Sequence, residues 1–274
     1  MTCAVLTPWW RARTDLGPAG AAEAGAVEVG GGTAPTPILD REHPGVRALV
    51  RAVGDEGPPV ERLRRAHRLI VARVRPVYSV EDLRPVSEVL RRGCGSCSQR
   101  LAALEAVARA GGVPTRVRGL VVDGTFWYPR FPRLRRIVPD RVVLAWPEFR
   151  IDGGWVSVGE LFGAAAGRGA EGGSAEGGFA GDGSAEGGFA GGGFANRGSE
   201  TLFEALARTP IDWDGPAVCP ADGAGCDLSA YVLADLGRFD SRDELFARHG
   251  QTLCGPARLV AEPVLGRWAA GAAA

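Results

Sequence analysis

The sequence predicts an α+β fold in which helices come first and an antiparallel β-sheet follows. Apolar residues recur at helical spacing between residues 59 and 110. From residue 115 to residue 158, β-branched and aromatic residues dominate, and Asp152-Gly153-Gly154 is typical of a hairpin turn between two strands. Helices that precede strands, instead of alternating with them, favour α+β over a doubly wound sheet.

Each element of this fold has a local justification. A helix over 59–74 places its apolar residues near one face, and a short helix lies within 80–92. The clearest helix spans 96–110, and Gly111-Gly112 ends it. Strands are expected at 115–122, 141–151 and 155–158, and two short helices at 230–236 and 242–249.

The chain divides into four regions by composition. Residues 1–37 include a stretch rich in Gly, Ala and Pro and are expected to form a flexible lead-in, and 38–162 form the core. Residues 163–200 form a glycine-rich insertion in which the string Gly173–Gly181 recurs unchanged at Gly183–Gly191, and this composition predicts disorder. Residues 201–274 are expected to be a C-terminal helical region that packs on the core.

Charge and hydropathy exclude several classes of protein. The 274 residues carry 32 basic and 32 acidic groups, and their formal net charge is zero. This balance argues against a general nucleic-acid or membrane-surface binder. There is no apolar run of the roughly 18–20 residues that a membrane span needs and no secretory signal pattern, so we expect a cytoplasmic protein. Six cysteines are too few for a disulfide scaffold of this length.

The most informative segment surrounds Cys97. Ser96 is placed as an N-cap and Gln99 lies three residues later, which together predict a capping box. Cys97 then falls in the first turn of the helix, where unpaired backbone N–H groups and the helix dipole favour a thiolate. Cys97 is therefore a candidate nucleophile.

Two motifs of this sequence resemble those of the transglutaminase-like superfamily. Gly95-Ser-Cys97, a helix, and then Arg109-Ala-Gly-Gly-Val-Pro114-Thr-Arg116 look like the family's cysteine motif. Leu144-Ala-Trp146-Pro-Glu148, a turn, and then Trp155-Val-Ser-Val-Gly159 look like its second motif. The resemblance covers about residues 55–160. It implies a papain-like fold with the Cys-bearing helix packed on an antiparallel sheet, and a protein or peptide as substrate or partner. We expect no cofactor and no metal.

The resemblance also identifies two departures. The family's catalytic histidine position is occupied by Leu144, and its aspartate position by Gly159. Leucine cannot take the thiol proton as imidazole does, and no histidine lies between His67 and His249. Trp127, in a loop that mixes aromatic residues with arginines, and Trp146 are expected to be binding residues of the cleft.

The sequence leaves three functions open. The first is a thiol acyl-transfer or amide-hydrolysis scaffold that retains the Cys97 nucleophile with a degraded triad. The second is a catalytically inactive module that binds peptides. The third is a redox dithiol protein, because Cys94 and Cys97 form a C-x-x-C pair at a helix start. Whether the chain is an enzyme is therefore open.

Overall fold

The computed structural model describes residues 29–131, 135, 138–162, 194, 196, 200–215, 226–253, 258, 259, 261 and 262. Its α-helices are α1 (Pro44–Val53), α2 (Pro59–Arg73), α3 (Val86–Arg92), α4 (Cys97–Ala110), α5 (Val158–Leu161), α6 (Leu202–Ala205) and α7 (Arg242–His249). Its strands are β1 (Arg75–Pro76), β2 (Cys94–Gly95), β3 (Thr115–Asp123), β4 (Arg141–Ile151), β5 (Gly154–Ser157), β6 (Ile211–Asp212), β7 (Cys226–Asp227) and β8 (Val232–Phe239). In this described part, no helix is long and apolar enough to cross a membrane.

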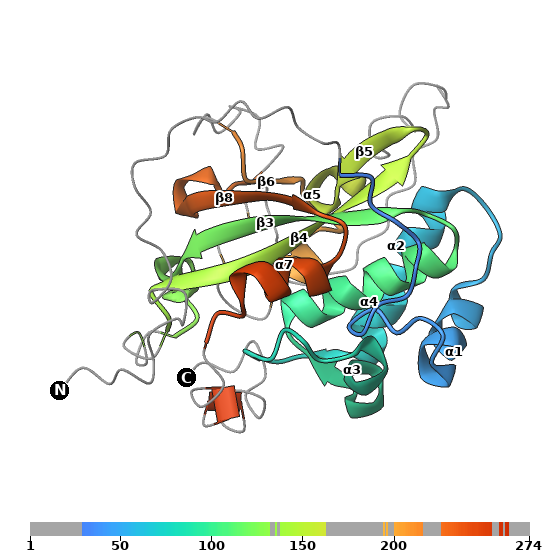
Figure 1. Ribbon diagram of the computed structural model, residues 1–274, viewed down its shortest axis with the longest axis horizontal. Helices are drawn as coiled ribbons and strands as arrows, with labels where there is room; N and C mark the ends of the chain where they lie inside the picture. Colours follow the sequence, from blue (N-terminus) through green and yellow to red (C-terminus); the bar gives the residue numbers. More distant parts are fainter. Residues whose placement is uncertain are drawn as a thin grey trace, which may run out of the picture.

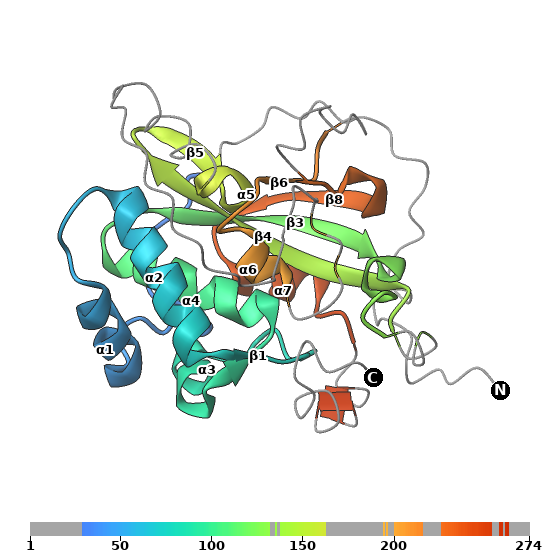
Figure 2. The same cartoon turned by 180° about the vertical axis from the view of Figure 1, so that it is seen from behind.

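The main sheet is antiparallel, with the strand order β5-β4-β3-β8. Helices α1 to α4 lie together on one side of it, and α7 lies across β3 (Figures 1 and 2). Helix α4 is buried along almost its whole length and packs on β3 and β4. The α+β fold, with a Cys-bearing helix packed on an antiparallel sheet, is therefore confirmed.

The turn between β4 and β5 has the predicted hairpin geometry. Asp152 and Gly153 both have positive φ, 51° and 84°, as a two-residue turn that matches the twist of its strands requires. The turn sets the register of Ile151 against Gly154 and of Glu148 against Ser157. This register places the end of β5, and so the start of α5 that follows it, beside Glu148 of β4.

The helix predicted over 230–236 is wrong. This segment instead contains the start of β8, which pairs antiparallel with the edge of β3 that β4 leaves free. Its Ala and Leu residues favour a helix locally, but pairing with an open strand edge outweighs that preference. The helix predicted over 242–249 is confirmed as α7.

The predicted lead-in and insertion lie largely outside the described residues. Within the lead-in, Gly32 exchanges two backbone hydrogen bonds of 3.0 Å with Thr115 of β3, so the last part of 1–37 is attached to the sheet. Of the predicted insertion 163–200, the structure describes Phe194, Asn196 and Glu200.

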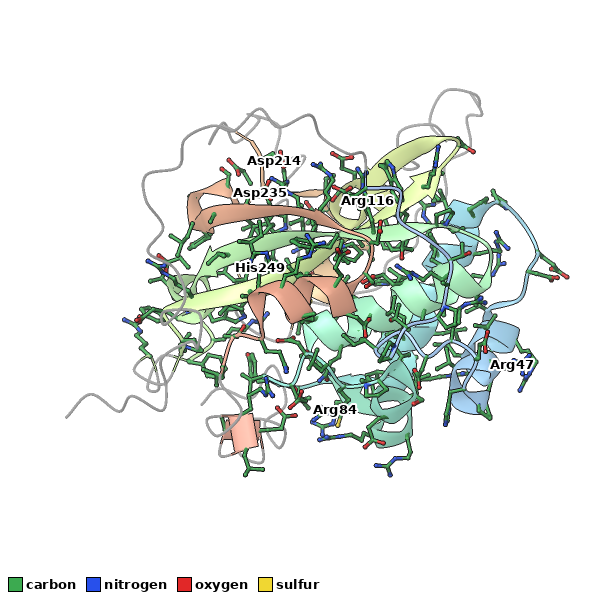
Figure 3. The ribbon with its side chains drawn as sticks, viewed as in Figure 1. Arg47, Arg84, Arg116, Asp214, Asp235 and His249 are labelled. Atoms are coloured by element: carbon green, nitrogen blue, oxygen red, sulfur yellow. The ribbon has the colours of Figure 1, made fainter. Side chains whose placement is uncertain are left out.

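Arginines tie separate segments to the sheet. Arg118 on β3 pairs with Asp235 on β8 and with Asp214, which follows β6; both acids lie over the β8 side of the sheet (Figure 3). Arg116 pairs with the buried Glu148 of β4 at 2.5 Å. Through these ion pairs, segments that precede the insertion and segments that follow it are attached to the same sheet.

Candidate functional site

The N-terminus of α4 has the predicted capping box. The Ser96 hydroxyl accepts a hydrogen bond from the Gln99 backbone N–H at 3.2 Å, and the Ser96 N–H donates to Gln99 Oε1 at 3.0 Å. Cys97 is the first residue of the helix. The capping prediction is confirmed, and it places the sulfur at the positive end of the helix dipole.

Two glycines bring the chain into this turn. Gly93 ends α3 in a left-handed conformation, with φ of 60°. A Cβ on Gly95 would lie 2.8 Å from Val89 Cγ1, so a side chain does not fit there. Strand β2, which contains Gly95, pairs in parallel with β1, and this pairing places the residues after β1 beside Cys97.

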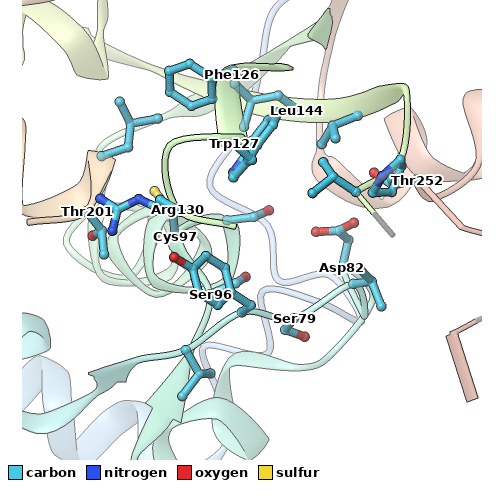
Figure 4. Close-up of a pocket in the computed structure, with 18 of the residues that line it drawn as sticks. Ser79, Asp82, Ser96, Cys97, Phe126, Trp127, Arg130, Leu144, Thr201 and Thr252 are labelled. Carbon is cyan, nitrogen blue, oxygen red and sulfur yellow. The ribbon is translucent and has the colours of Figure 1, made fainter. Parts of the chain in front are cut away.

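Cys97 lines a cavity of about 170 Å³. The wall opposite the start of α4 is formed by Leu144 of β4 and by Trp127, which lies in a short 3-10 helix (Figure 4). The lining is largely apolar, with Val142, Val143, Phe126 and Phe131 among its residues. Its charged groups, among the residues that the structure describes, are Asp82 and Arg130.

Burial dominates the acidity of Cys97. It raises the pKa of the thiol to about 12, although Arg100, Arg242 and Arg130 act in the opposite direction; Glu204 adds to the rise. The helix N-terminus also favours the thiolate, but a half-buried sulfur in an apolar cavity loses more from desolvation. At neutral pH Cys97 is a thiol.

Leu144 and Gly159 have different surroundings. Leu144 is buried, faces the cavity and pairs with Leu120 across the sheet. Gly159 lies in α5, and a Cβ there would overlap the backbone carbonyl of Ile211 in β6 and lie 3.2 Å from Trp146 Cζ2. No side chain fits at residue 159 unless β6 moves.

The structure places the three histidines away from the cavity lining. His43 caps α1 and accepts a hydrogen bond from Gly45 N–H at 3.1 Å. His67 of α2 is buried, stacks on Phe203 and bonds to the Phe203 carbonyl at 2.7 Å; burial lowers its pKa. His249 ends α7 and packs edge-on against Phe239. Each histidine has a structural contact of its own.

The two predicted binding tryptophans have different positions. Trp127 lines the cavity. Trp146 is 2% exposed, donates to the Ser157 hydroxyl at 2.8 Å and packs edge-on against Trp213. Trp146 therefore supports the junction of β4 with β5 and β6 and is not among the residues that line the cavity.

Sequence reasoning missed Asp82, a half-buried carboxyl in the cavity wall. Burial raises the pKa of Asp82 to about 6, against the lowering effect of Arg242 and of a hydrogen bond from the Ser98 hydroxyl. The signal was not visible in sequence because Asp82 lies in a loop without periodicity. Three residues far apart in the chain, Gln99, Gln251 and Glu262, hold that loop.

The cysteines other than Cys97 form no second site among the described residues. Cys94 in β2 and Cys97 are both free thiols, and Cys94 does not line the cavity. The other cysteine side chains lie outside the described part of the chain. No cluster of three His, Cys, Asp or Glu side chains that could hold a metal ion occurs among the described residues.

The comparisons with known proteins agree with this geometry. No curated protein matches the chain. Residues 47–159 match the family model of the transglutaminase-like superfamily. The matched span begins in α1, contains the start of α4 with Cys97 and the β4 wall with Leu144, and ends at Gly159. Residues 47–159 therefore form a domain of the transglutaminase-like superfamily.

Proposed function

We propose that this domain is a catalytically silent relative of thiol acyltransferases, and that its cavity binds a peptide segment. One observation carries the proposal: Leu144, which by resemblance takes the family's histidine position, faces the same cavity as Cys97. A leucine there leaves the thiol without an imidazole base at this position. Loss of a general base of this kind costs on the order of 10²–10⁴-fold in rate.

The state of the thiol supports the same conclusion. A nucleophilic cysteine needs a thiolate, which an imidazole partner or a lowered pKa provides. Burial instead raises the pKa of Cys97 to about 12. The family's aspartate position offers no compensation, since Gly159 has no room for a side chain.

The cavity itself suits binding. Ligand sites are concave and mostly apolar, and a few polar groups fix the orientation of the ligand. Here the walls are aliphatic and aromatic, and the polar side chains of Asp82, Tyr78 and Thr252 face them. Such a cavity can take a peptide side chain without any covalent step.

Hydrolysis assays test whether the domain lacks catalytic activity. We expect wild-type protein and Cys97→Ala to hydrolyse peptide anilides and p-nitrophenyl esters at the same background rate. A rate at least tenfold above that of Cys97→Ala, in protein of equal folded fraction, would refute the silent state.

A single substitution tests the role of Leu144. Leu144→His places an imidazole at the cavity wall, where it can hold a thiolate as an ion pair. We expect the alkylation rate of Cys97 at pH 7 to rise at least about tenfold, measured by mass spectrometry of the peptide that contains Cys97. The matched control is Leu144→Asn, which is polar but not basic. Equal rates in both variants would contradict the assignment of Leu144.

Binding is tested by filling the cavity. A mixture of N-acetylated pentapeptides is equilibrated with the protein, and the retained peptides are identified by mass spectrometry. We expect Leu144→Trp to lose the peptides that the wild type retains, while circular dichroism shows an unchanged fold. Equal retention by the two proteins would place peptide binding outside this cavity.

A further inference from the structure

We propose that Asp82 selects the ligand of the cavity and that it binds a guanidinium, the side chain of an arginine in the bound peptide. This inference rests on the proposed peptide-binding function and names the chemical class of its ligand. It follows from how Asp82 is held, how its charge is balanced and what the cavity walls are made of.

The loop that carries Asp82 is held from three sides. Gln99, which caps α4, also donates from Nε2 to Ser79 Oγ at 2.9 Å and to the Glu81 carbonyl at 2.8 Å. Glu262 accepts from Ser79 Oγ at 2.8 Å, and Gln251 accepts from the Asp82 N–H at 2.7 Å. The backbone that carries the carboxyl is therefore held in place before any ligand arrives, which lowers the entropic cost of binding.

The described cations near Asp82 form ion pairs with other acids, and not with Asp82. Arg242 of α7 forms an ion pair with the buried Glu105, and Arg258 pairs with Glu81 at 3.3 Å. Arg242 also donates to Ser98 Oγ at 3.1 Å, and the Ser98 hydroxyl is hydrogen-bonded to Asp82. Among the described residues, Arg242 and Arg258 thus each pair with an acid other than Asp82. A carboxylate with one hydroxyl partner in an apolar cavity is stabilised by a cation that donates several hydrogen bonds.

Arg130, the cation that the described part of the chain contributes to the cavity lining, does not neutralise Asp82. The two side chains enter the cavity from opposite sides (Figure 4). Arg130 Nε donates to Asn196 Oδ1 at 2.6 Å, and its Nη2 donates to the Glu200 carbonyl. These bonds hold Arg130 in the wall, so the Asp82 side of the cavity keeps a negative charge.

The walls favour a guanidinium over a primary amine. Tyr78 and Phe131 pack with their ring centroids 4.3 Å apart, and Trp127 adds a third ring to the lining. A planar guanidinium stacks on aromatic rings and binds a carboxylate with two parallel hydrogen bonds, whereas an ammonium is a compact, strongly hydrated charge. The methylene stem of arginine suits the aliphatic wall at Leu144.

Four peptides test the ligand class by isothermal titration calorimetry. They share the sequence Ac-Gly-Ala-X-Ala-Gly-amide, where X is arginine, its neutral isostere citrulline, lysine or norleucine. With wild-type protein at pH 7, we expect the arginine peptide to bind at least about tenfold more tightly than the other three. Equal affinity for citrulline or for lysine would overturn the guanidinium assignment.

Two variants assign the effect to Asp82. We expect Asp82→Asn to remove the preference for arginine over citrulline. The matched control is Asp235→Asn, which changes an exposed acid of β8 that pairs with Arg118 of β3, and this variant should keep the preference. Arginine binding by wild type should weaken about tenfold between pH 7 and pH 5, as Asp82 takes up a proton, and the binding by Asp82→Asn should not. A full preference in Asp82→Asn would overturn the proposal.

The same experiment separates this inference from the proposed function. If Leu144→Trp abolishes binding of all four peptides while wild type binds them equally, the cavity is a peptide site and only the role of Asp82 is wrong. If wild type binds no peptide at all, the proposed function and this inference both fail.

Discussion

At the scale of single residues, two titratable groups in one cavity are shifted in the same direction. Burial raises the pKa of both Cys97 and Asp82, because each charged form loses water that the protein does not replace. The consequences differ. Cys97 stays protonated at neutral pH, whereas Asp82, with a pKa of about 6, is mostly ionised there. The cavity therefore presents one neutral thiol and one carboxylate.

Alkylation kinetics check the state of Cys97. Since burial raises its pKa to about 12, we expect iodoacetamide to modify it at pH 7.5 at least about 100-fold more slowly than a free cysteine. The rate should keep rising above pH 10. Site-resolved mass spectrometry follows Cys97 separately from Cys94. A plateau of the Cys97 rate near pH 8.5 would contradict the effect of burial.

Asp82 should cost the fold stability at neutral pH. Burial raises the pKa of Asp82 in the folded state to about 6, so the folded protein holds this proton more tightly than the unfolded chain does. The free energy of unfolding is therefore higher at pH 4 and falls as the pH rises through 6. We expect Asp82→Asn to raise the free energy of unfolding at pH 7 by about 1–3 kcal/mol and to change it little at pH 4. Urea denaturation at both pH values measures the difference. An Asp82→Asn variant that is less stable than wild type at pH 7 would contradict this prediction.

At the scale of elements, α7 is joined to α4 and β4 through one guanidinium. Arg242 is 1% exposed; it pairs with Glu105 of α4, contacts Ser98 Oγ and donates to the Ala145 carbonyl of β4 at 3.3 Å. Removing one partner of a buried ion pair leaves the other charge without compensation. This single side chain therefore contributes to the packing of three elements.

Replacing Arg242 tests this connection. We expect Arg242→Ala to lower the free energy of unfolding by about 3–5 kcal/mol. The matched control on the same helix is Arg248→Ala, which breaks an exposed pair with Glu244 and should cost about 0–1 kcal/mol. Urea denaturation measures both. Similar losses in the two variants would show that burial of the pair does not matter.

The elements that the sequence predicts well are those with local signals. The capping box of Ser96 and Gln99, the turn at Asp152 and the helix that begins at Cys97 depend on residues a few positions apart. The strand β8 was missed because its pairing partner, β3, lies more than a hundred residues earlier in the chain. Asp82 was missed for the same physical reason, since Gln251 and Glu262, which position it, come from the C-terminal end.

At the scale of the whole molecule, segments on both sides of the glycine-rich region build one cavity. Leu144 and Trp127 precede that region, Asn196 lies near its end, and Thr201 and Leu202 follow it. Phe194 is buried near Phe126, at a ring distance of 6.3 Å. The repeat therefore connects two parts of one wall.

Shortening the repeat tests whether its length matters. Deleting residues 183–192 removes one copy of the repeated string and keeps Phe194. Because the cost of closing a flexible loop changes slowly with its length, we expect the free energy of unfolding to change by less than about 0.6 kcal/mol. Thermal and urea denaturation measure it. A loss above 2 kcal/mol would show that the deleted residues make specific contacts.

The close contact between Gly159 and the Ile211 carbonyl has a consequence for attempts to build a catalytic triad in this domain. One codon change can place an imidazole at the wall in position 144, but no single change can place a carboxylate at residue 159, because β6 occupies its space. An engineer who wants a working triad must orient the new ring with an acid from another direction, or first redesign the path of the chain around Ile211. The exclusion of a carboxylate at residue 159 is thus built into the backbone, while the apolar wall at residue 144 is only a choice of side chain.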